Sequence, residues 1–514
     1  PLANAALSGL FLGIAWLSGH HEVPLMVSLA LALAWLALLI RRGIAVLAPA
    51  ALTFLTAALT GAAQLWPTLE FGRLARRWGP PGPGPVGWGD VVSYLSAEMY
   101  SLTPRGLAGV LLPDQGTIGD SSGFLGLTAV FLAAAAVCSC WRSPAVRWFA
   151  VAGVLAAAYA MGAFTPLHGI LYSLVPELHK ARVPVRALHL ANFAFAVLVA
   201  YGADRLLSRR DWGLLPAGAA AAGVLGAAIV LAAAVAKLNL GDAMLLSGWA
   251  GMVLCAAVFA WRAGRVGRLS LLAILAFLML AEMHAVHTRA WRNRYAESGQ
   301  PFARALAENR DVAAFLRSEP VLVRAAVNDQ DVPVNFGDLH SINATEGYVA
   351  GVTANLLRFA RHTPWSQRLY AVTHYLAREP NRPDLVDAFE GSSGVKVFRI
   401  PGALPRARAV HEIVTVPDAR ALNSAMEHPD FDPAQTVVPV GAAPELERCQ
   451  GGGVAVTAYA PNRVRLRAEM PCRGMVILSD TYYPGWRAYV GGRETRIWEA
   501  YGALRGVVVE AGSH

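Results

Sequence analysis

The stretch EVPLMVSLALALAWLALLIRRG, residues 22–43, decides the fold of this chain. Residues 23–40 carry no charged side chain, and about 20 consecutive apolar residues is the length that lets a helix cross a bilayer. The run ends in Arg41 and Arg42. It therefore predicts a membrane-spanning helix with a basic end.

About nine apolar runs of this type precede residue 289, and each is long enough to predict a membrane helix. They lie near residues 4–19, 23–40, 44–69, 123–141, 145–162, 185–207, 213–236, 243–261 and 269–287. Arginines gather in every second gap between the runs, at Arg41 and Arg42, at Arg142 and Arg147, at Arg205, Arg209 and Arg210, and at Arg262, Arg265 and Arg268. This alternation is typical of the positive-inside bias of polytopic membrane proteins. We expect a multi-pass protein of the cytoplasmic membrane, with its first helix starting inside and everything after residue 288 on the outer face.

Composition agrees with a membrane protein and argues against a nucleic-acid-binding one. The chain has 514 residues, of which 55% are hydrophobic and 15% charged, too apolar for an ordinary soluble protein. The net charge of +9 is concentrated in the basic gaps just described, so membrane topology explains most of it. We therefore predict the lipid bilayer, and no nucleic acid, as a partner.

The region after residue 288 is predicted to form two extracytoplasmic domains. Residues 289–445 mix helical patterns with short strand runs and predict an α/β domain over 289–445. Residues 446–514 read as alternating strands separated by Pro-Asn, Pro-Gly and Gly-Gly turns, which predicts a β-sandwich domain. The chain starts at Pro1 and stops just after a strand-like run, so we expect a fragment with a truncated last domain. Cys449 and Cys472 both fall in this region, and the sequence leaves open whether they pair.

A basic cluster on the predicted outer face is the sharpest sign of function. Lys180, Arg182 and Arg186 lie beside the start of a membrane helix, on the side that the positive-inside bias leaves poor in cations. Arginine suits bidentate phosphate contacts, and a helix N-terminus adds backbone donors. The cluster predicts a site for a lipid phosphate. The alternative is that these side chains only reach ordinary head groups.

A polar turn and a helix end add candidate catalytic and substrate-contacting residues on the same face. His20, His21 and Glu22 form a turn of acid/base types between two apolar runs, although a simple hydrated turn is the alternative. The turn also offers ligands to a divalent cation, which stays open as a cofactor, but adjacent histidines rarely bind one ion, so we assign no metal ligands. Gln64, Pro67 and Glu70 are predicted to end the third helix, where Glu70 either orients a sugar hydroxyl, or caps the helix or pairs with Arg73. We name Glu22 and Glu70 as candidate catalytic acids, and His20, His21, Gln64 and His179 as candidate substrate contacts.

Further polar and aromatic residues have two interpretations each. Glu282, His284 and His287 have a spacing that suits a metal, but exposed interfacial side chains are the favoured interpretation. Near the C-terminus, four aromatic side chains either stack on sugar rings or fill the core of the sandwich. They are Tyr482, Tyr483, Trp486 and Trp498.

Several segments resemble the bacterial YfhO-type membrane proteins. These are GLFLGIAWLSGHHEVPL (9–25), AAQLWPTLEF (62–71), the long segment AMGAFTPLHGILYSLVPELHKARVPVRALHLANFAFAVLVAYGADRLL (160–207) and, in the tail, VTAYAPNRVRLRAE (456–469) and LSDTYYPGWRAYVGG (478–492). The resemblance covers nearly the whole chain. It implies a fold similar to GT-C glycosyltransferases, which take a sugar from a polyprenyl-phosphate carrier and pass it to a cell-envelope glycopolymer.

The resemblance implies roles for some of the residues above. Arg182 and Arg186 would hold the carrier phosphate as it leaves, and a carboxylate would activate the acceptor hydroxyl. GT-C enzymes carry their characteristic acid in the first outward loop, which we expect upstream of this chain, so we expect the fragment to be inactive alone. The alternatives are a non-enzymatic accessory or transport component for lipid-linked sugars, and a membrane-anchored carbohydrate-binding protein.

Overall fold

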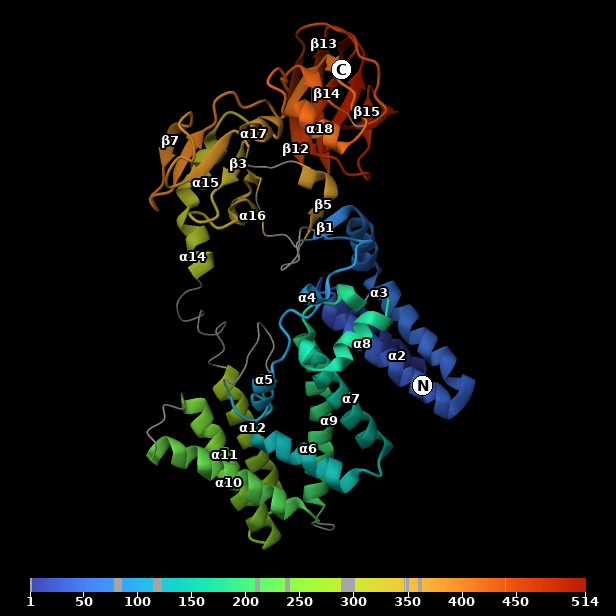
Figure 1. Ribbon diagram of the computed structural model, residues 1–514, viewed down its shortest axis with the longest axis vertical. Coiled ribbons are helices and arrows are strands. Elements are labelled where there is room, and N and C mark those ends of the chain that lie inside the picture. The colour runs from blue at the N-terminus through green and yellow to red at the C-terminus, as the bar shows by residue number, and fades with distance from the viewer. Residues whose placement is uncertain are drawn as a thin grey trace. The chain divides into compact units, whose positions relative to one another are not determined.

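The chain divides into two compact units (Figure 1). The computed structural model describes residues 2–77, 86–113, 123–176, 178–208, 213–235, 241–287, 301–345, 347, 351–358, 363–439 and 441–514. We call Pro1–Arg73 with Trp78–Ala296 unit 1, and Leu74–Arg77 with Glu297–His514 unit 2. The junction predicted between residues 288 and 289 lies outside the described residues.

Unit 1 is helical over most of its described length. Its elements are α1 (Leu2–Trp16), α2 (Glu22–Arg42), η1 (Gly43–Val46), α3 (Leu47–Leu74), β2 (Val86–Gly87), α4 (Tyr94–Ala97), α5 (Pro104–Ala108), α6 (Leu127–Cys140), α7 (Pro144–Ala160), η2 (Gly162–Phe164), α8 (Pro166–Leu174), η3 (Leu178–Lys180), η4 (Pro184–Ala187), α9 (Leu188–Leu207), α10 (Leu215–Val235), α11 (Gly241–Arg262) and α12 (Arg268–His287). Within the described residues, every range predicted as an apolar run contains one of these helices.

Four described helical stretches are long and apolar enough to cross a membrane. They are Glu22–Leu74, Pro184–Leu207, Leu215–Val235 and Gly241–Arg262. The apolar helices α1, α6 and α7 are shorter. These long apolar helices are compatible with a membrane protein. The nine crossings and the side of the membrane on which each loop lies stay predictions.

The third predicted helix continues beyond its predicted end at residue 69. The prediction placed it over residues 44–69, but α3 runs from Leu47 to Leu74 with Pro67 inside it. Proline lacks the N–H of one helical hydrogen bond, yet its φ is already helical, and apolar helices tolerate it. Gln64 and Glu70 therefore lie within α3 and not at its end.

Neighbouring helices in unit 1 approach each other through glycines. A Cβ atom at Gly202 of α9 would overlap the carbonyl oxygen of Leu132 in α6, and one at Gly226 of α10 would overlap that of Gly248 in α11. Figure 1 shows α10 and α11 side by side. Small residues that let two backbones pack this closely are typical of helix pairs in membranes.

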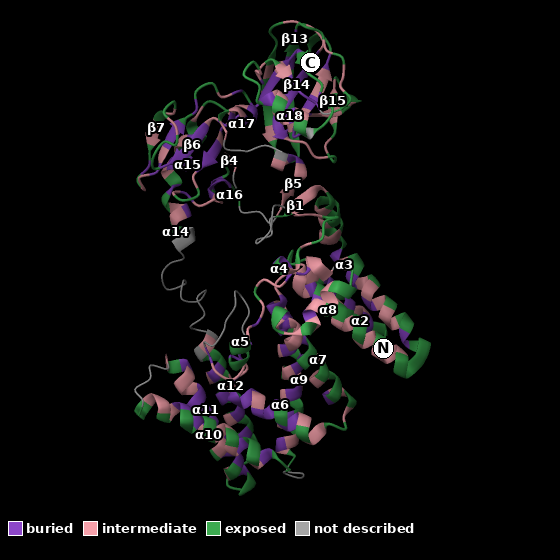
Figure 2. Cartoon of the chain, viewed as in Figure 1, coloured by how far each residue is buried: buried purple, intermediate pink, exposed green. Residues whose placement is uncertain are grey.

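Many large apolar residues of these helices are exposed, and Figure 2 shows exposed positions in green along them. Among them Phe11 is 67% exposed, Trp66 75% and Leu269 80%. Exposed apolar area on this scale is unfavourable in water and suits contact with lipid. The exposed apolar side chains and the helix lengths are therefore both compatible with a membrane protein.

Glu282 is buried, which corrects the prediction that it is an exposed interfacial residue. It is 1% exposed, and its carboxylate accepts hydrogen bonds from the N–H groups of Leu127 at 2.8 Å and Thr128 at 3.2 Å. These are orphan donors at the start of α6, where a negative group also meets a favourable helix dipole. Gly126 has φ +85°, and a Cβ atom there would lie 2.8 Å from the carboxylate carbon. Of its predicted companions, His284 is exposed, and the side chain of His287 lies outside the description.

Replacement of Glu282 tests this cap. We expect Glu282→Ala to reduce the stability of unit 1 by about 1–3 kcal/mol, because two buried N–H groups lose their acceptor. Glu282→Gln keeps an acceptor oxygen and should lose clearly less. Thermal unfolding of the detergent-solubilised chain measures both variants. Equal losses for the two would show that the hydrogen bonds to α6 contribute little.

Unit 2 begins with a mixed five-stranded sheet of order β4-β3-β6-β8-β7. The strands are β3 (Arg324–Val327), β4 (Asn343–Ala344), β6 (His374–Ala377), β7 (Val386–Glu390) and β8 (Lys396–Arg399). β3 runs parallel to β4 and β6, and β8 runs antiparallel to β6 and β7. Three helices accompany the sheet, namely α14 (Pro301–Glu308), α15 (Arg310–Ser318) and α16 (Phe336–His340), and buried residues of all three join its core.

Two further sheets follow the five-stranded sheet in the chain. One has order β17-β18-β14-β9, from β9 (Ala407–Val410), β14 (Gly474–Thr481), β17 (Ile497–Ala500) and β18 (Leu504–Val509). The other has order β12-β13-β19, from β12 (Gly453–Ala460), β13 (Arg463–Met470) and β19 (Gly512–Ser513). Met470 and Ala468 of the second sheet pack with Val476 and Val509 of the first. The remaining elements are β1 (Ala75–Arg77), β5 (Val352–Thr353), η5 (Ala354–Arg358), α17 (Pro364–Leu369), β10 (Glu412–Ile413), α18 (Ala419–Met426), β11 (Thr436–Val437), β15 (Ala488–Val490) and β16 (Arg493–Thr495).

The predicted boundary between residues 445 and 446 does not separate two cores. β9, which precedes it, pairs antiparallel with β14, which follows it. One cluster of buried side chains includes Tyr375 and Phe398 of the five-stranded sheet together with Ile477 and Leu504 of the sheet that contains β9 and β14. The strand alternation after residue 446 identified the strands but not the earlier strand that completes their sheet.

Asp480 connects five segments of unit 2. It is 7% exposed, and its carboxylate accepts from Arg324 at 2.8 Å, from Arg406 at 3.3 Å and from the hydroxyl of Tyr459 at 3.1 Å. Arg505 lies 3.7 Å away. We call these five residues the Asp480 cluster. It places three guanidinium groups around one carboxylate, so removal of the acid would leave several buried cations without their counter-charge.

The buried imidazole of His374 predicts that unit 2 loses stability in acid. His374 is 1% exposed in β6, and burial lowers its pKa below the ordinary value although Glu319 acts in the opposite direction. The unfolded chain therefore binds a proton more readily, and stability should fall as the pH drops below about 6.5. Hydrogen exchange of the peptide that contains β6, corrected for intrinsic rates, measures this loss. In His374→Asn the acid-dependent loss of protection should be smaller, whereas an identical loss would assign it to other groups.

Candidate functional site

The structure joins two residues that the sequence assigned to separate sites. Glu22, in the first turn of α2, forms an ion pair with Arg186 of η4. The side chains are 15% and 23% exposed, so the pair is mostly shielded from water. Glu22 also lies at the positive end of the α2 dipole. A guanidinium and a carboxylate thus meet where two apolar helices begin.

The backbone next to Arg186 is strained. Val183 has φ +65° and ψ +66°, the left-handed region that a β-branched residue rarely adopts. Such a conformation costs about 1–3 kcal/mol and persists only when its surroundings enforce it. Here Val185 is buried in a cluster that includes Met26 of α2 and Leu102. The packing therefore fixes the turn between Arg182 and Arg186.

A group of aromatic rings lies within the same unit, around His168. His168 is 2% exposed, with ring centroids 5.0 Å from Tyr159 and 5.5 Å from Tyr94. Tyr94 also contacts Tyr172 at 5.1 Å, and the hydroxyl of Tyr172 donates to the carbonyl of Val92 at 2.8 Å. This group was not predicted, because its rings come from segments far apart in the chain and the segment that carries His168 and Tyr172 is otherwise apolar. The rings tie α8 to the loop that precedes α4.

Two other predicted site residues hold that same loop. The N–H of Val92 donates to Nδ1 of His179 at 3.3 Å, so His179 acts as an acceptor for the backbone. The ammonium of Lys180 lies 4.6 Å from the ring centroid of Trp88. A phosphate that binds Lys180 would share the cation with this ring.

The predicted turn at residues 20–22 points its two histidines differently. His20 is exposed, while His21 stacks on Trp16 with ring centroids 6.1 Å apart. The Nδ1 atom of His21 is buried and has no hydrogen-bond partner among the described residues. The residue before Glu22 therefore carries a buried ring nitrogen that makes no hydrogen bond to the described residues.

The two predicted residues of α3 differ in exposure. Gln64 donates to the hydroxyl of Thr68 at 3.3 Å, one turn along α3. Glu70 is exposed on the same helix.

Arginines cover both predicted sugar-stacking tryptophans of unit 2. Arg505 lies 3.9 Å from the ring centroid of Trp486, and Arg496 lies 3.9 Å from that of Trp498. Trp498 also packs against the main core of the unit. Tyr482 and Tyr483 are half-buried. These contacts favour the core interpretation over sugar stacking, at least for Trp498.

The side chains able to hold a metal lie elsewhere. Among the described residues, the one group of three or more ligating side chains close enough to share an ion consists of His411, Cys449 and Cys472 in unit 2. The turn at His20, His21 and Glu22 forms no such group. A divalent cation at that turn has no support from the geometry.

Comparison with known proteins adds no assignment. No protein-family model, curated protein or solved structure matches the chain. The resemblance to YfhO-type proteins therefore stays a prediction. The ion pair between Glu22 and Arg186, with the residues around it, is the feature of unit 1 that bears on function.

Charge reversal tests whether Glu22 and Arg186 interact directly. We expect Glu22→Arg and Arg186→Glu each to lower the thermal midpoint of the solubilised chain, because each places two like charges together in a shielded position. The double variant restores opposite charges and should recover much of the loss, with a coupling energy of about 1 kcal/mol or more. Purely additive effects would mean that the pair contributes nothing to stability.

Proposed function

We propose that this chain is a multi-pass membrane protein that binds the phosphate of a lipid-linked sugar at the outer membrane face, as the GT-C-like resemblance implies. The observation that carries the proposal is Arg186, paired with Glu22 and fixed by the strained turn at Val183. It lies at the start of the candidate membrane span Pro184–Leu207. There a guanidinium can reach a phosphate while its hydrocarbon stem remains in apolar surroundings.

Exchange of partners gives the pair a chemical use. A phosphate that binds Arg186 offers two oxygens to the guanidinium fork and competes with the carboxylate of Glu22. Glu22, once released, regains the basicity needed to accept a proton from an acceptor hydroxyl. Arg182, on the other side of Val183, would add charge to stabilise the leaving phosphate. The products would be a glycosylated cell-envelope polymer and the free polyprenyl phosphate.

The proposed arrangement includes nine membrane crossings, with the four basic gaps in the cytoplasm and unit 2 outside. The helices found in all nine predicted ranges support the number, and the alternating arginines support the direction. Under this arrangement the ion pair, His179 and Lys180 share one side of the membrane. Phosphate binding is the step that these residues carry, so binding is the first measurement to make on this chain.

A non-enzymatic role in carrying lipid-linked sugars is the second candidate. One observation favours it, namely that Glu22 is already paired with Arg186. A carboxylate beside a guanidinium is a weak base, because the neighbouring charge stabilises its ionised form. If the phosphate does not displace Glu22, the site can hold the ligand without activating an acceptor.

Binding to nanodisc-embedded protein tests the phosphate site. We expect Arg186→Ala to weaken binding of a polyprenyl-phosphate sugar by about tenfold or more, since a charge-assisted contact is worth about 1.5–3 kcal/mol. Arg41→Ala, in the first basic gap, is the matched control and should bind normally. Unchanged binding in both Arg182→Ala and Arg186→Ala would refute the proposal.

Glu22→Gln separates the enzyme from the carrier. If the unsubstituted protein transfers sugar, an enzyme that uses Glu22 should lose transfer by about a hundredfold in Glu22→Gln while binding remains, because general-base catalysis contributes on that scale. Normal transfer in Glu22→Gln would exclude Glu22 as the base. Binding without transfer in the unsubstituted protein would favour the carrier role.

A further inference from the structure

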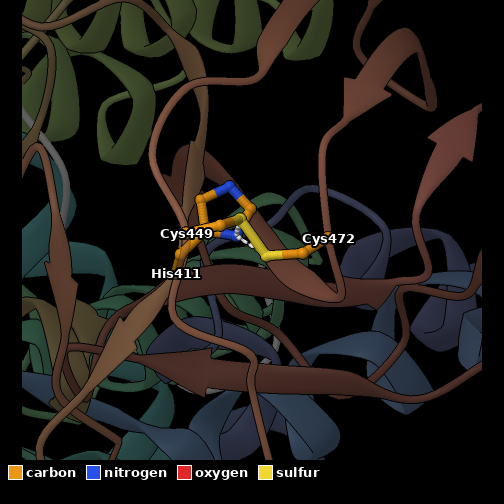
Figure 3. A group of neighbouring side chains, drawn as sticks. All are labelled: His411, Cys449 and Cys472. Atoms are coloured by element: carbon orange, nitrogen blue, oxygen red, sulfur yellow. Dashed lines mark hydrogen bonds between the residues drawn. A yellow bond between two sulfur atoms is a disulfide. The ribbon is translucent and has the colours of Figure 1, made fainter.

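Cys449 and Cys472 form a disulfide, which settles the pairing that the sequence left open. Cys449 precedes β12, and Cys472 lies in the turn between β13 and β14. His411, just after β9, places its ring against this bond, with Nδ1 3.3 Å from each sulfur (Figure 3). The three side chains come from segments far apart in sequence and belong to one unit.

The hydrogen bond of His411 fixes which ring nitrogen carries the proton. Nε2 lies 3.1 Å from the carbonyl oxygen of Gly451, which can only accept, so Nε2 is the donor. A neutral ring then presents an unprotonated Nδ1 to the sulfurs. Disulfide sulfurs carry no hydrogen, so this lone pair has no donor to accept from in either cysteine. A buried imidazole lone pair thus points at two potential metal ligands.

The surroundings hold the ring in this position. His411 is 5% exposed, and a Cβ atom at Gly474 would lie 2.5 Å from its Nδ1. Gly474 thus leaves room for the ring beside the sulfurs. A histidine that binds a metal through one ring nitrogen usually donates a hydrogen bond from the other, often to a backbone carbonyl. His411 has this arrangement, with Nε2 bonded to the carbonyl of Gly451 and Nδ1 facing the sulfurs.

We propose that reduction of this disulfide creates a binding site for a thiophilic divalent cation such as Zn²⁺, with Nδ1 of His411 and the two thiolates as ligands. A dithiol reductant donates two electrons and two protons, becomes a disulfide itself, and leaves Cys449 and Cys472 as thiols. Binding of the cation then releases both thiol protons. The disulfide and the metal exclude each other, so the group acts as a redox-controlled metal site.

The separations suit zinc. Tetrahedral Zn²⁺ with Zn–S of about 2.3 Å and Zn–N of about 2.0 Å requires an N···S separation of about 3.5 Å. Nδ1 is already 3.3 Å from both sulfurs, and the three ligating atoms lie within 4.8 Å of one another. The Cα atoms of the cysteines are 6.4 Å apart, so side-chain rotation alone can separate the sulfurs enough to share an ion. Three protein ligands leave the fourth position open.

Cobalt titration of the full chain tests the site. The three other cysteines are first replaced, as Cys138→Ser, Cys140→Ser and Cys255→Ser, so that only the pair remains. After phosphine reduction under nitrogen, Co²⁺ should give thiolate-to-metal absorption with one ion per chain, and Zn²⁺ should abolish it. The oxidised protein should show no such absorption. Reduced protein that binds no more tightly than a Cys449→Ser, Cys472→Ser control would overturn the proposal.

Variants at His411 test the third ligand. His411→Ala should weaken Co²⁺ binding by about tenfold or more, since even partners outside the metal's own shell carry that much affinity. Quantitative return of the disulfide on oxidation shows that the variant still folds. His411→Cys supplies another soft ligand and should restore tight binding, which also decides the case if His411→Ala fails to fold. Unchanged affinity in a folded His411→Ala protein would remove His411 from the site.

Discussion

Three acidic groups that leave water in the described part of this protein do so with a partner of opposite charge or with backbone N–H groups. Glu282 meets the open N–H groups of α6, Asp480 meets three guanidinium groups, and Glu22 meets Arg186. An uncompensated buried charge would cost several kcal/mol, a large part of the stability of a folded domain. Each of these partnerships joins elements that are distant in sequence. They therefore determine which helices and strands lie together, as well as offsetting desolvation.

The helices of unit 1 could be predicted from the sequence because their signal is local. A long apolar run fixes both the helical conformation and its length, since hydrocarbon leaves no other way to satisfy the backbone. All nine expected ranges contain helices within the described residues, although α3 runs on to Leu74, beyond its predicted end at residue 69. The alternating strands after residue 446 were visible for the same reason, as their period of two is a property of each segment alone.

Features that depend on distant contacts could not be predicted. Glu282 reads as one polar residue near a helix end, and nothing in its neighbours reveals the open start of α6. Glu22 and Arg186 were both recognised as candidates, but for different sites, because spacing carries no information on elements separated by 160 residues or so. The left-handed turn at Val183 is contrary to residue preference and arises from packing. The core shared across residue 445 likewise needs β9, whose partner lies about 70 residues later.

The disulfide between Cys449 and Cys472 encloses the whole β12–β13 hairpin in a covalent loop. A protease that cuts once inside this loop breaks the backbone but leaves the two pieces joined, so β14 and β18 stay attached to the sheet they complete. Only reduction would let the fragments separate. The hairpin is thus a segment that can be nicked without loss of the chain end, and the oxidation state of a single bond decides whether a cut there is damaging.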